Sequence, residues 1–68
     1  MAIEIELNGE TRQIATGHTL QNLVDTMQLA GQALAIAVNR QVVSRQKWGE
    51  RSLTQGDRVE IVRAIGGG

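Results

Sequence analysis

The sequence contains no cysteine, proline, phenylalanine or tyrosine, and it has a single histidine. Without cysteine, disulfides and thiolate metal sites are excluded, and one histidine cannot build a metal site with its own kind. The absence of cysteine also fits a reducing compartment. A chain of 68 residues forms one domain with a thin core. We therefore expect a fold that packing and regular structure stabilise, with no metal and no covalent staple.

The chain has no excess of positive or negative charge. Seven basic and seven acidic residues are scattered singly and give a formal net charge of zero. Nucleic-acid-binding proteins usually show a basic stripe, and none is visible, so we expect no nucleic-acid partner. No apolar run has the length that spans a bilayer, and no charged-then-apolar leader opens the sequence. Hydrophobic residues make up 41%, which is typical of a folded domain. We expect a cytoplasmic protein that does not associate with membranes.

The first part of the chain predicts a hairpin. Apolar and polar residues alternate over Ala2–Leu7, which indicates a strand with one buried face. Asn8-Gly9 follows at once, and this pair accepts the positive φ angles of a type I′ hairpin turn. A second, more exposed strand is expected over Glu10–Ala15.

A short amphipathic helix is expected next. Thr19 is a candidate N-cap, because its hydroxyl can accept a hydrogen bond from a free amide of the first turn. Apolar residues then recur at helical spacing and form one stripe: Leu20, Leu23, Val24 and Met27. Gly31 would end this region. We interpret His18, just before the cap, as a solvated turn residue.

The second half predicts three further segments. Residues 34–38 alternate as a strand in which Leu34, Ile36 and Val38 share the core face, and Asn39-Arg40 makes a tight turn into a short strand at residues 42–43. An irregular stretch over 45–53 follows. A final strand is expected over 58–65, with Val59 and Ile61 facing the core. The order of hairpin, helix, strand pair and strand indicates an α+β domain.

Two features of residues 45–53 have a structural interpretation. Trp48 is the only aromatic residue of the chain, and we expect it to cover the edge of the core rather than to bind a ligand. Arg45, Lys47 and Arg51 form a loose basic cluster, for which a solvated loop is favoured over a docking contact.

Taken in order, several short segments resemble the thiamine-biosynthesis sulfur carriers, the ThiS family, along essentially the whole chain. The matching segments are residues 7–9 at the first turn, 20–23 in the helix, 37–39 before the second turn, 43–45 with Trp48, Gly56-Asp57 before the last strand, and the ending from Ala64 to Gly68. Each segment is weak evidence alone, since Asn-Gly and Gly-Asp turns are common. Their order and spacing carry the resemblance.

The resemblance implies a ubiquitin-like β-grasp fold: a mixed sheet of four to five strands, with one main helix on one face and the last strand beside the first. It implies a β-grasp domain over residues 1–65 and a flexible glycine tail over 66–68. Proteins of this family are carriers rather than enzymes. The implied partners are a ThiF-type adenylating enzyme, a persulfide sulfur donor and a ThiG-type thiazole synthase.

The implied site is Gly68, whose carboxylate would be adenylated and converted to a thiocarboxylate (1-thioglycine), with Gly66 and Gly67 threading into the partner. ATP and Mg²⁺ would belong to the adenylating enzyme, and no cofactor is expected to stay bound. The sequence agrees, because it has no Gly-rich phosphate loop followed by Lys and Ser or Thr. Strand alternation also predicts an apolar docking surface on the open face of the sheet, composed of Ala35, Ala37, Val62 and Ala64. Ile65, which follows Ala64, is a further candidate docking residue.

Three alternatives stay open from the residues. The small subunit of molybdopterin synthase shares the fold and the glycine end, but that family tends to be richer in phenylalanine and to carry prolines before its glycines, and this chain has neither. Sulfur delivery into another pathway is a second possibility. A protein-interaction module with an inert tail belongs to a different class, and only a carrier would acquire sulfur at its terminus.

Overall fold

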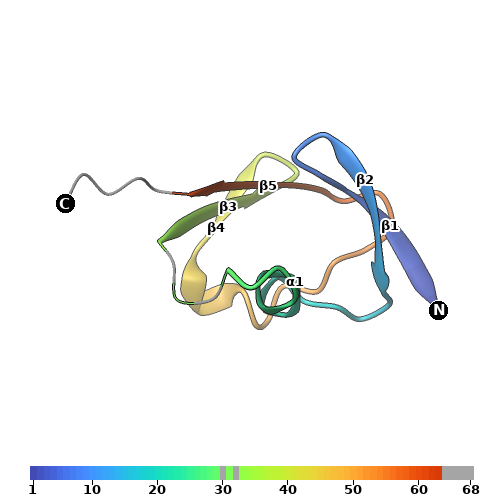
Figure 1. Ribbon diagram of the computed structural model, residues 1–68, viewed down its shortest axis with the longest axis horizontal. Coiled ribbons are helices and arrows are strands. Elements are labelled where there is room, and N and C mark those ends of the chain that lie inside the picture. The colour runs from blue at the N-terminus through green and yellow to red at the C-terminus, as the bar shows by residue number, and fades with distance from the viewer. Residues whose placement is uncertain (30, 32, 64–68) are drawn as a thin grey trace.

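The computed structural model describes residues 1–29, 31 and 33–63. Their elements follow the predicted order, with a single α-helix among five strands: β1 (Ala2–Leu7), β2 (Glu10–Ala15), α1 (Leu20–Thr26), β3 (Leu34–Val38), β4 (Gln41–Val43), a short 3₁₀ turn (Arg45–Lys47) and β5 (Arg58–Arg63). The strands form one curved sheet, and α1 lies against its concave side (Figure 1). The α+β prediction is confirmed.

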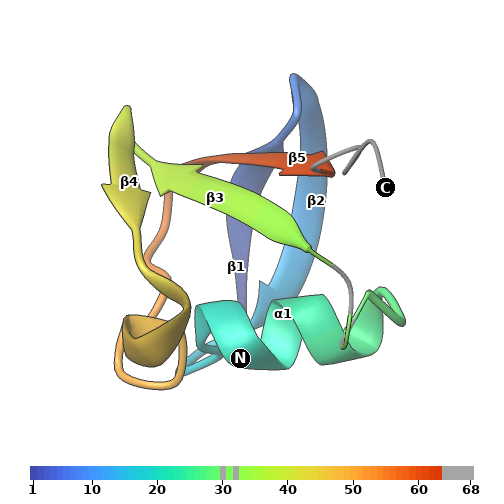
Figure 2. The ribbon, with the colours of Figure 1, turned by 90° about the vertical axis from the view of Figure 1, so that its left-hand side faces the viewer.

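The sheet is mixed and has the strand order β2-β1-β5-β3-β4. The chain's last described strand, β5, lies in the middle and runs parallel to β1, with Leu7 opposite Val59. The other neighbouring strands are antiparallel. The pairing of first and last strands is therefore confirmed, and the β-grasp arrangement has all five strands. Figure 2 shows the paired strands β3 and β5 above the helix.

The core fills the space between the sheet and α1. Alternating strand residues and the helical stripe supply most of it, as their spacing predicts: Ile5, Leu7, Ile14, Leu20, Leu23, Val24, Ile36, Val38 and Val59. Trp48 and Leu53, from the segment between β4 and β5, complete it. Leu34 and Ile61 pack against this cluster but are only partly buried. Each buried aliphatic side chain contributes about 1.5–3 kcal/mol by leaving water. A core this small explains why the helix needs only two turns to cover it.

The helix begins where the sequence predicts. Thr19 is the N-cap, and its hydroxyl oxygen accepts a hydrogen bond from the backbone N–H of Asn22 at 3.1 Å. The Asn22 side chain in turn accepts one from the backbone N–H of Thr19 at 3.0 Å. This reciprocal pair is a capping box, with Asn in the place of the usual Glu or Gln. It satisfies two amide groups that have no partner inside the helix.

Both tight turns place asparagine in the left-handed region of backbone space. Asn8 has φ of 49° and is followed by Gly9 at 86°, while Asn39 has φ of 51° and is followed by Arg40 at 70°. Positive φ at both central residues is the requirement of the type I′ hairpin turn, whose twist matches that of the strands. The turn predictions at both positions are confirmed.

Residues 45–53 differ from the expected irregular stretch at their start, since Arg45–Lys47 form a 3₁₀ turn. Trp48 follows this turn, is 2% exposed and donates its indole N–H to the carbonyl of Val43 at 3.0 Å. The guanidinium of Arg45 lies 5.2 Å from the ring centroid. The expectation that Trp48 covers the core edge is confirmed, and its polar atom has a partner.

The surroundings of His18 also differ from expectation. The residue is half-buried rather than fully solvated. Its backbone N–H donates to the carbonyl of Ala15, and its own carbonyl accepts from Leu53. These two bonds connect the end of β2 to the segment before β5.

Candidate functional site at the end of the last strand

The candidate tail continues from β5, the central strand of the sheet. On one side β5 pairs with β3 as far as Arg63, which lies opposite Leu34. On the other side it pairs with β1 only at Arg58 and Val59. Gly66, Gly67 and Gly68 lie outside the described residues, as do Ala64 and Ile65. The structure therefore describes the strand that precedes these residues, and the predicted role of Gly68 stays a prediction.

Three of the predicted docking residues lie together on the sheet face turned away from α1. Ala35 pairs with Val62 in the β3–β5 ladder, and Ala37 lies two residues further along β3. Val62 is 62% exposed, whereas Ala37 is half-buried. One residue of this surface was not predicted: Val42 pairs with Ala37 from β4 and is 81% exposed.

We call the surface made by Ala35, Ala37, Val42 and Val62 the open-face patch. The signal for Val42 was present in the sequence, because turn geometry fixes the register of a hairpin. A turn at Asn39-Arg40 places Val42 opposite Ala37. Its docking role stays a prediction.

Charged side chains border the open-face patch on the side of β1. Glu60 lies opposite Ala37 in the β3–β5 ladder and is exposed. Beyond it, Arg58 forms an ion pair with Glu6 at 2.8 Å, with roughly half of each side chain exposed. Such exposed pairs contribute about 0–1 kcal/mol to stability. An apolar centre with a charged border is typical of a protein-binding surface.

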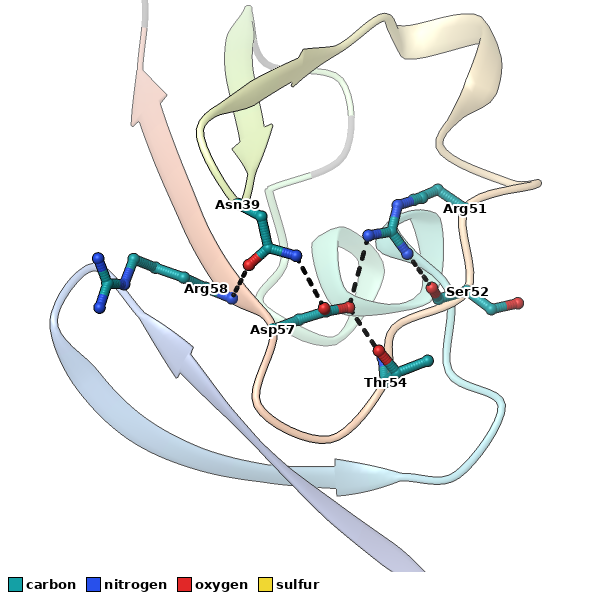
Figure 3. Close-up of polar contacts among 6 residues, drawn as sticks. All are labelled: Asn39, Arg51, Ser52, Thr54, Asp57 and Arg58. Carbon is teal, nitrogen blue, oxygen red and sulfur yellow. Dashed lines mark hydrogen bonds and ion pairs between the residues drawn. The ribbon is translucent and has the colours of Figure 1, made fainter.

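A buried carboxylate, that of Asp57, fixes the beginning of β5 (Figure 3). Asp57 is 6% exposed. One oxygen, Oδ1, accepts from the Asn39 amide at 3.0 Å, and the other, Oδ2, accepts from the backbone N–H of Thr54 at 2.9 Å. Arg51 approaches Oδ2 to 3.6 Å and also donates to the carbonyl of Ser52. These contacts connect the β3–β4 turn and residues 51–54 to the strand that leads to the tail.

The surroundings of Asp57 determine its pKa. Burial by itself would raise it, but the Thr54 N–H, the Asn39 amide and the positive charge of Arg51 together outweigh burial, so the pKa lies below the ordinary 3.8. The expected solvated basic cluster is corrected here, because Arg51 is half-buried against Asp57. The contacts around the Asp57 carboxylate were not predicted from the sequence, although Asn39 and Asp57 each belong to a segment that was singled out there.

No group of three or more His, Cys, Asp or Glu side chains within residues 1–29, 31 and 33–63 could hold a metal ion. In the same part of the chain, no helix is long and apolar enough for a membrane crossing.

The chain is similar to one known protein family and to individual proteins of that family. The model of the ThiS family matches residues 5–68. The sulfur carrier protein ThiS of Escherichia coli K12 is 29% identical over 66 residues, which cover 97% of this chain and 100% of that protein. The crystal structure of thiamine biosynthesis protein ThiS from Geobacter metallireducens superposes with a TM-score of 0.83 at 22% identity, covering 97% and 100% of the two chains. This last likeness shows a shared fold.

Two longer proteins also contain a similar stretch. Thiazole synthase of Magnetococcus marinus MC-1 is 38% identical over 66 residues, and thiazole synthase of Paramagnetospirillum magneticum AMB-1 is 27% identical over 66 residues. In each case the match covers 97% of this chain but 20% of the synthase. The chain thus spans only a fifth of the length of these relatives.

Proposed function

This chain belongs to the ThiS family, and we propose that it carries sulfur as a thiocarboxylate on the backbone carboxylate of Gly68. Family membership and the full-length likeness to the Escherichia coli carrier make it a sulfur carrier of thiamine biosynthesis. Among the carrier functions that the sequence left open, the family match favours thiamine biosynthesis over molybdopterin synthase. The observation that carries the proposal is that the family match continues through the glycines to residue 68.

The proposed chemistry needs activation, because the charge of a carboxylate is delocalised and makes it a poor electrophile. A ThiF-type adenylating enzyme would bind Mg-ATP, and the Gly68 carboxylate would attack the α-phosphate and release pyrophosphate. The terminal sulfur of a donor persulfide then displaces AMP and forms an acyl disulfide. A thiol then attacks the sulfur of the donor's own side chain and breaks the S–S bond. The thiol and the donor form a mixed disulfide, and the transferred sulfur stays on Gly68 as the thiocarboxylate.

Glycine suits the delivered end of the chain. It has no Cβ, so its backbone can enter a narrow channel and adopt angles that other residues avoid. Extended chain spans roughly 3.3–3.6 Å per residue, so residues 64–68 could reach on the order of 17 Å beyond β5. We propose that Gly66 and Gly67 thread into the partner while the folded body stays outside.

The proposed receiver of the sulfur is a thiazole synthase. Two thiazole synthases contain a stretch similar to nearly all of this chain, which supports a working association between a domain of this kind and that enzyme. The adenylating enzyme and the persulfide donor are part of the proposal on chemical grounds. We place the protein in the cytoplasm, where thiols that reduce the acyl disulfide are maintained.

Mass spectrometry tests the proposal directly. The protein is incubated with a ThiF-type enzyme, Mg-ATP, a persulfide donor and a thiol, and its intact mass is then measured. We expect a product with one oxygen exchanged for sulfur, located at Gly68 by fragmentation, and none without ATP. A product without sulfur in the complete mixture would contradict the carrier function and favour the interaction module.

The open-face patch yields a prediction about docking. Replacing Val62 by Glu should weaken binding to the adenylating enzyme about tenfold or more, because a charge would then be desolvated inside an apolar contact. The melting temperature should change little, because this side chain is 62% exposed and away from the core. Binding is measured by titration of the enzyme with each variant.

Gln41→Glu is the matched control for Val62→Glu. It also adds a carboxylate to an exposed strand residue, but Gln41 pairs with the core residue Val38 and so lies on the other face of the sheet. We expect binding close to that of the unmodified protein. If Val62→Glu binds as tightly as Gln41→Glu, the open-face patch is not the docking surface.

A further inference from the structure

The side chain of Asn8 continues the sheet beyond the end of β1. The backbone N–H of Asn8 donates to the carbonyl of Val59 at 2.9 Å, and the chain then turns away through Gly9. The Asn8 carboxamide nevertheless stays beside β5. Its Oδ1 accepts from the N–H of Ile61 at 2.9 Å, and its Nδ2 donates to the carbonyl of Ile61 at 3.3 Å. One side-chain amide therefore takes the place of the next peptide group of β1.

Asn39 is the counterpart of Asn8 on the opposite edge of β5. It ends β3 in a turn of the same left-handed geometry, and its backbone N–H donates to the carbonyl of Arg58 at 2.7 Å. Its Oδ1 accepts from the N–H of Arg58 at 3.0 Å. Asn39 thus holds the first residue of β5 from the β3 side, whereas Asn8 holds a residue near the end of β5 from the β1 side.

The position of Ile61 gives the Asn8 contact its consequence. Beyond Ile61, the described part of β5 pairs with β3 alone, at Val62 and Arg63. Strand ends that are paired on one edge open more readily than residues paired on both. Releasing Ile61 from Asn8 would therefore extend the region of easy opening toward the middle of the strand.

We propose that Asn8 is a positioning residue for sulfur loading: it holds the described end of β5, the strand from which the chain continues to Gly68. This inference rests on the proposed function of Gly68. A partner must place the carboxylate beside a nucleotide, and every residue that is not already ordered must be ordered during binding. Because Asn8 holds Ile61 before any partner binds, this part of β5 is already ordered in the free carrier.

The turn alone does not account for Asn8. Glycine would satisfy the left-handed backbone of a type I′ turn equally well. What glycine cannot supply is the carboxamide that bonds both polar groups of Ile61. The substitution Asn8→Gly therefore separates the two roles, because it keeps the turn and removes the contact.

The experiment compares Asn8→Gly with Asn39→Gly, which removes a turn carboxamide at the other end of β5. In Asn8→Gly, hydrogen exchange of the Val62 amide should be faster by about tenfold, the size expected for losing hydrogen bonds of this kind. The KM of the adenylating enzyme for the carrier should rise by about fivefold, with kcat unchanged, since bound carrier is ordered in both cases. Asn39→Gly should lower the melting temperature at least as much and leave both readouts unchanged.

Asn8→Asp provides a second variant if the glycine variant folds poorly. It keeps an acceptor for the Ile61 N–H but sets a carboxylate oxygen against the Ile61 carbonyl, so the same rise in KM is expected. An unchanged KM with an active unmodified protein overturns the positioning role and leaves the proposed function standing. An unmodified protein that gains no sulfur overturns both. Equal rises in KM for Asn8→Gly and Asn39→Gly would overturn the positioning role alone, since the effect would then come from lowered stability.

Discussion

Deletion of Gly68 should abolish sulfur loading while the protein keeps its fold. The new terminal carboxylate would lie one residue, roughly 3.5 Å, short of its position beside the nucleotide. A displacement of even about 1 Å can cost a hundredfold in rate where reacting groups must be aligned. Among the described residues, the core and the side chains packed against it extend no further along the chain than Ile61. We therefore expect a stability change well under about 0.5 kcal/mol.

Two further variants make the deletion interpretable. Adding one residue after Gly68 should be as damaging, because the reactive carboxylate then becomes an amide. Gly68→Ala is the matched control, since it keeps the carboxylate at its position and adds only a methyl group, so it should retain part of the activity. The measurement is ATP-dependent thiocarboxylate formation, with circular dichroism to verify the fold. Loading of the deletion and the extension at the rate of the unmodified protein would show that Gly68 is not the acceptor.

The fold could be predicted largely because local signals and burial agree along this sequence. The alternation over Ala2–Leu7 and the Asn-Gly pair after it specify a hairpin, and the helical stripe from Leu20 has the right length to cover a small sheet. The parallel pairing of β1 with β5 could not be predicted from local signals. It is a contact between distant segments, so periodicity could not supply it and only the family resemblance did.

The contacts that were missed are polar and long-range. Asp57 has the appearance of an ordinary turn residue, and nothing local shows that Asn39 and Arg51 converge on its carboxylate. The same is true of Asn8, whose turn role is visible in the sequence but whose contact with Ile61 depends on strand order. The candidate site itself could be predicted from the resemblance, since glycines carry no side chain whose packing would identify them.

The second large effect is expected at Asp57, where substitution by Ala should destabilise the protein by about 3 kcal/mol, because several polar groups lose the acceptor that they share. The variant removes a carboxylate that is 6% exposed and that accepts from the Thr54 N–H and the Asn39 amide and faces the Arg51 guanidinium. A loss of about 1 kcal/mol lowers the melting temperature of a domain this size by roughly 4–8 °C. Thermal unfolding should therefore show a decrease of roughly 15 °C. Below its melting temperature the variant should still acquire sulfur, because Asp57 has no part in the proposed chemistry.

The pH dependence of stability follows from the lowered pKa of Asp57. The folded protein binds this proton less readily than the unfolded chain, so the carboxylate stabilises the fold at every pH above the ordinary value of 3.8. That contribution is lost as the pH falls below 3.8 and through the lower folded pKa. Asp57→Asn, which cannot ionise, lacks it throughout. The stability difference between the unmodified protein and Asp57→Asn should be constant near neutral pH and should shrink in acid.

Asp25→Asn is the matched control for the charge change at Asp57. Asp25 is an exposed helix residue whose carboxylate accepts a hydrogen bond from Gln21 at 3.0 Å. The same chemical substitution there should change stability by no more than about 0.5 kcal/mol. Denaturant unfolding of the three proteins between neutral and acidic pH makes the comparison. If the difference between the unmodified protein and Asp57→Asn is the same at acidic and neutral pH, the Asp57 carboxylate does not stabilise the fold through its charge.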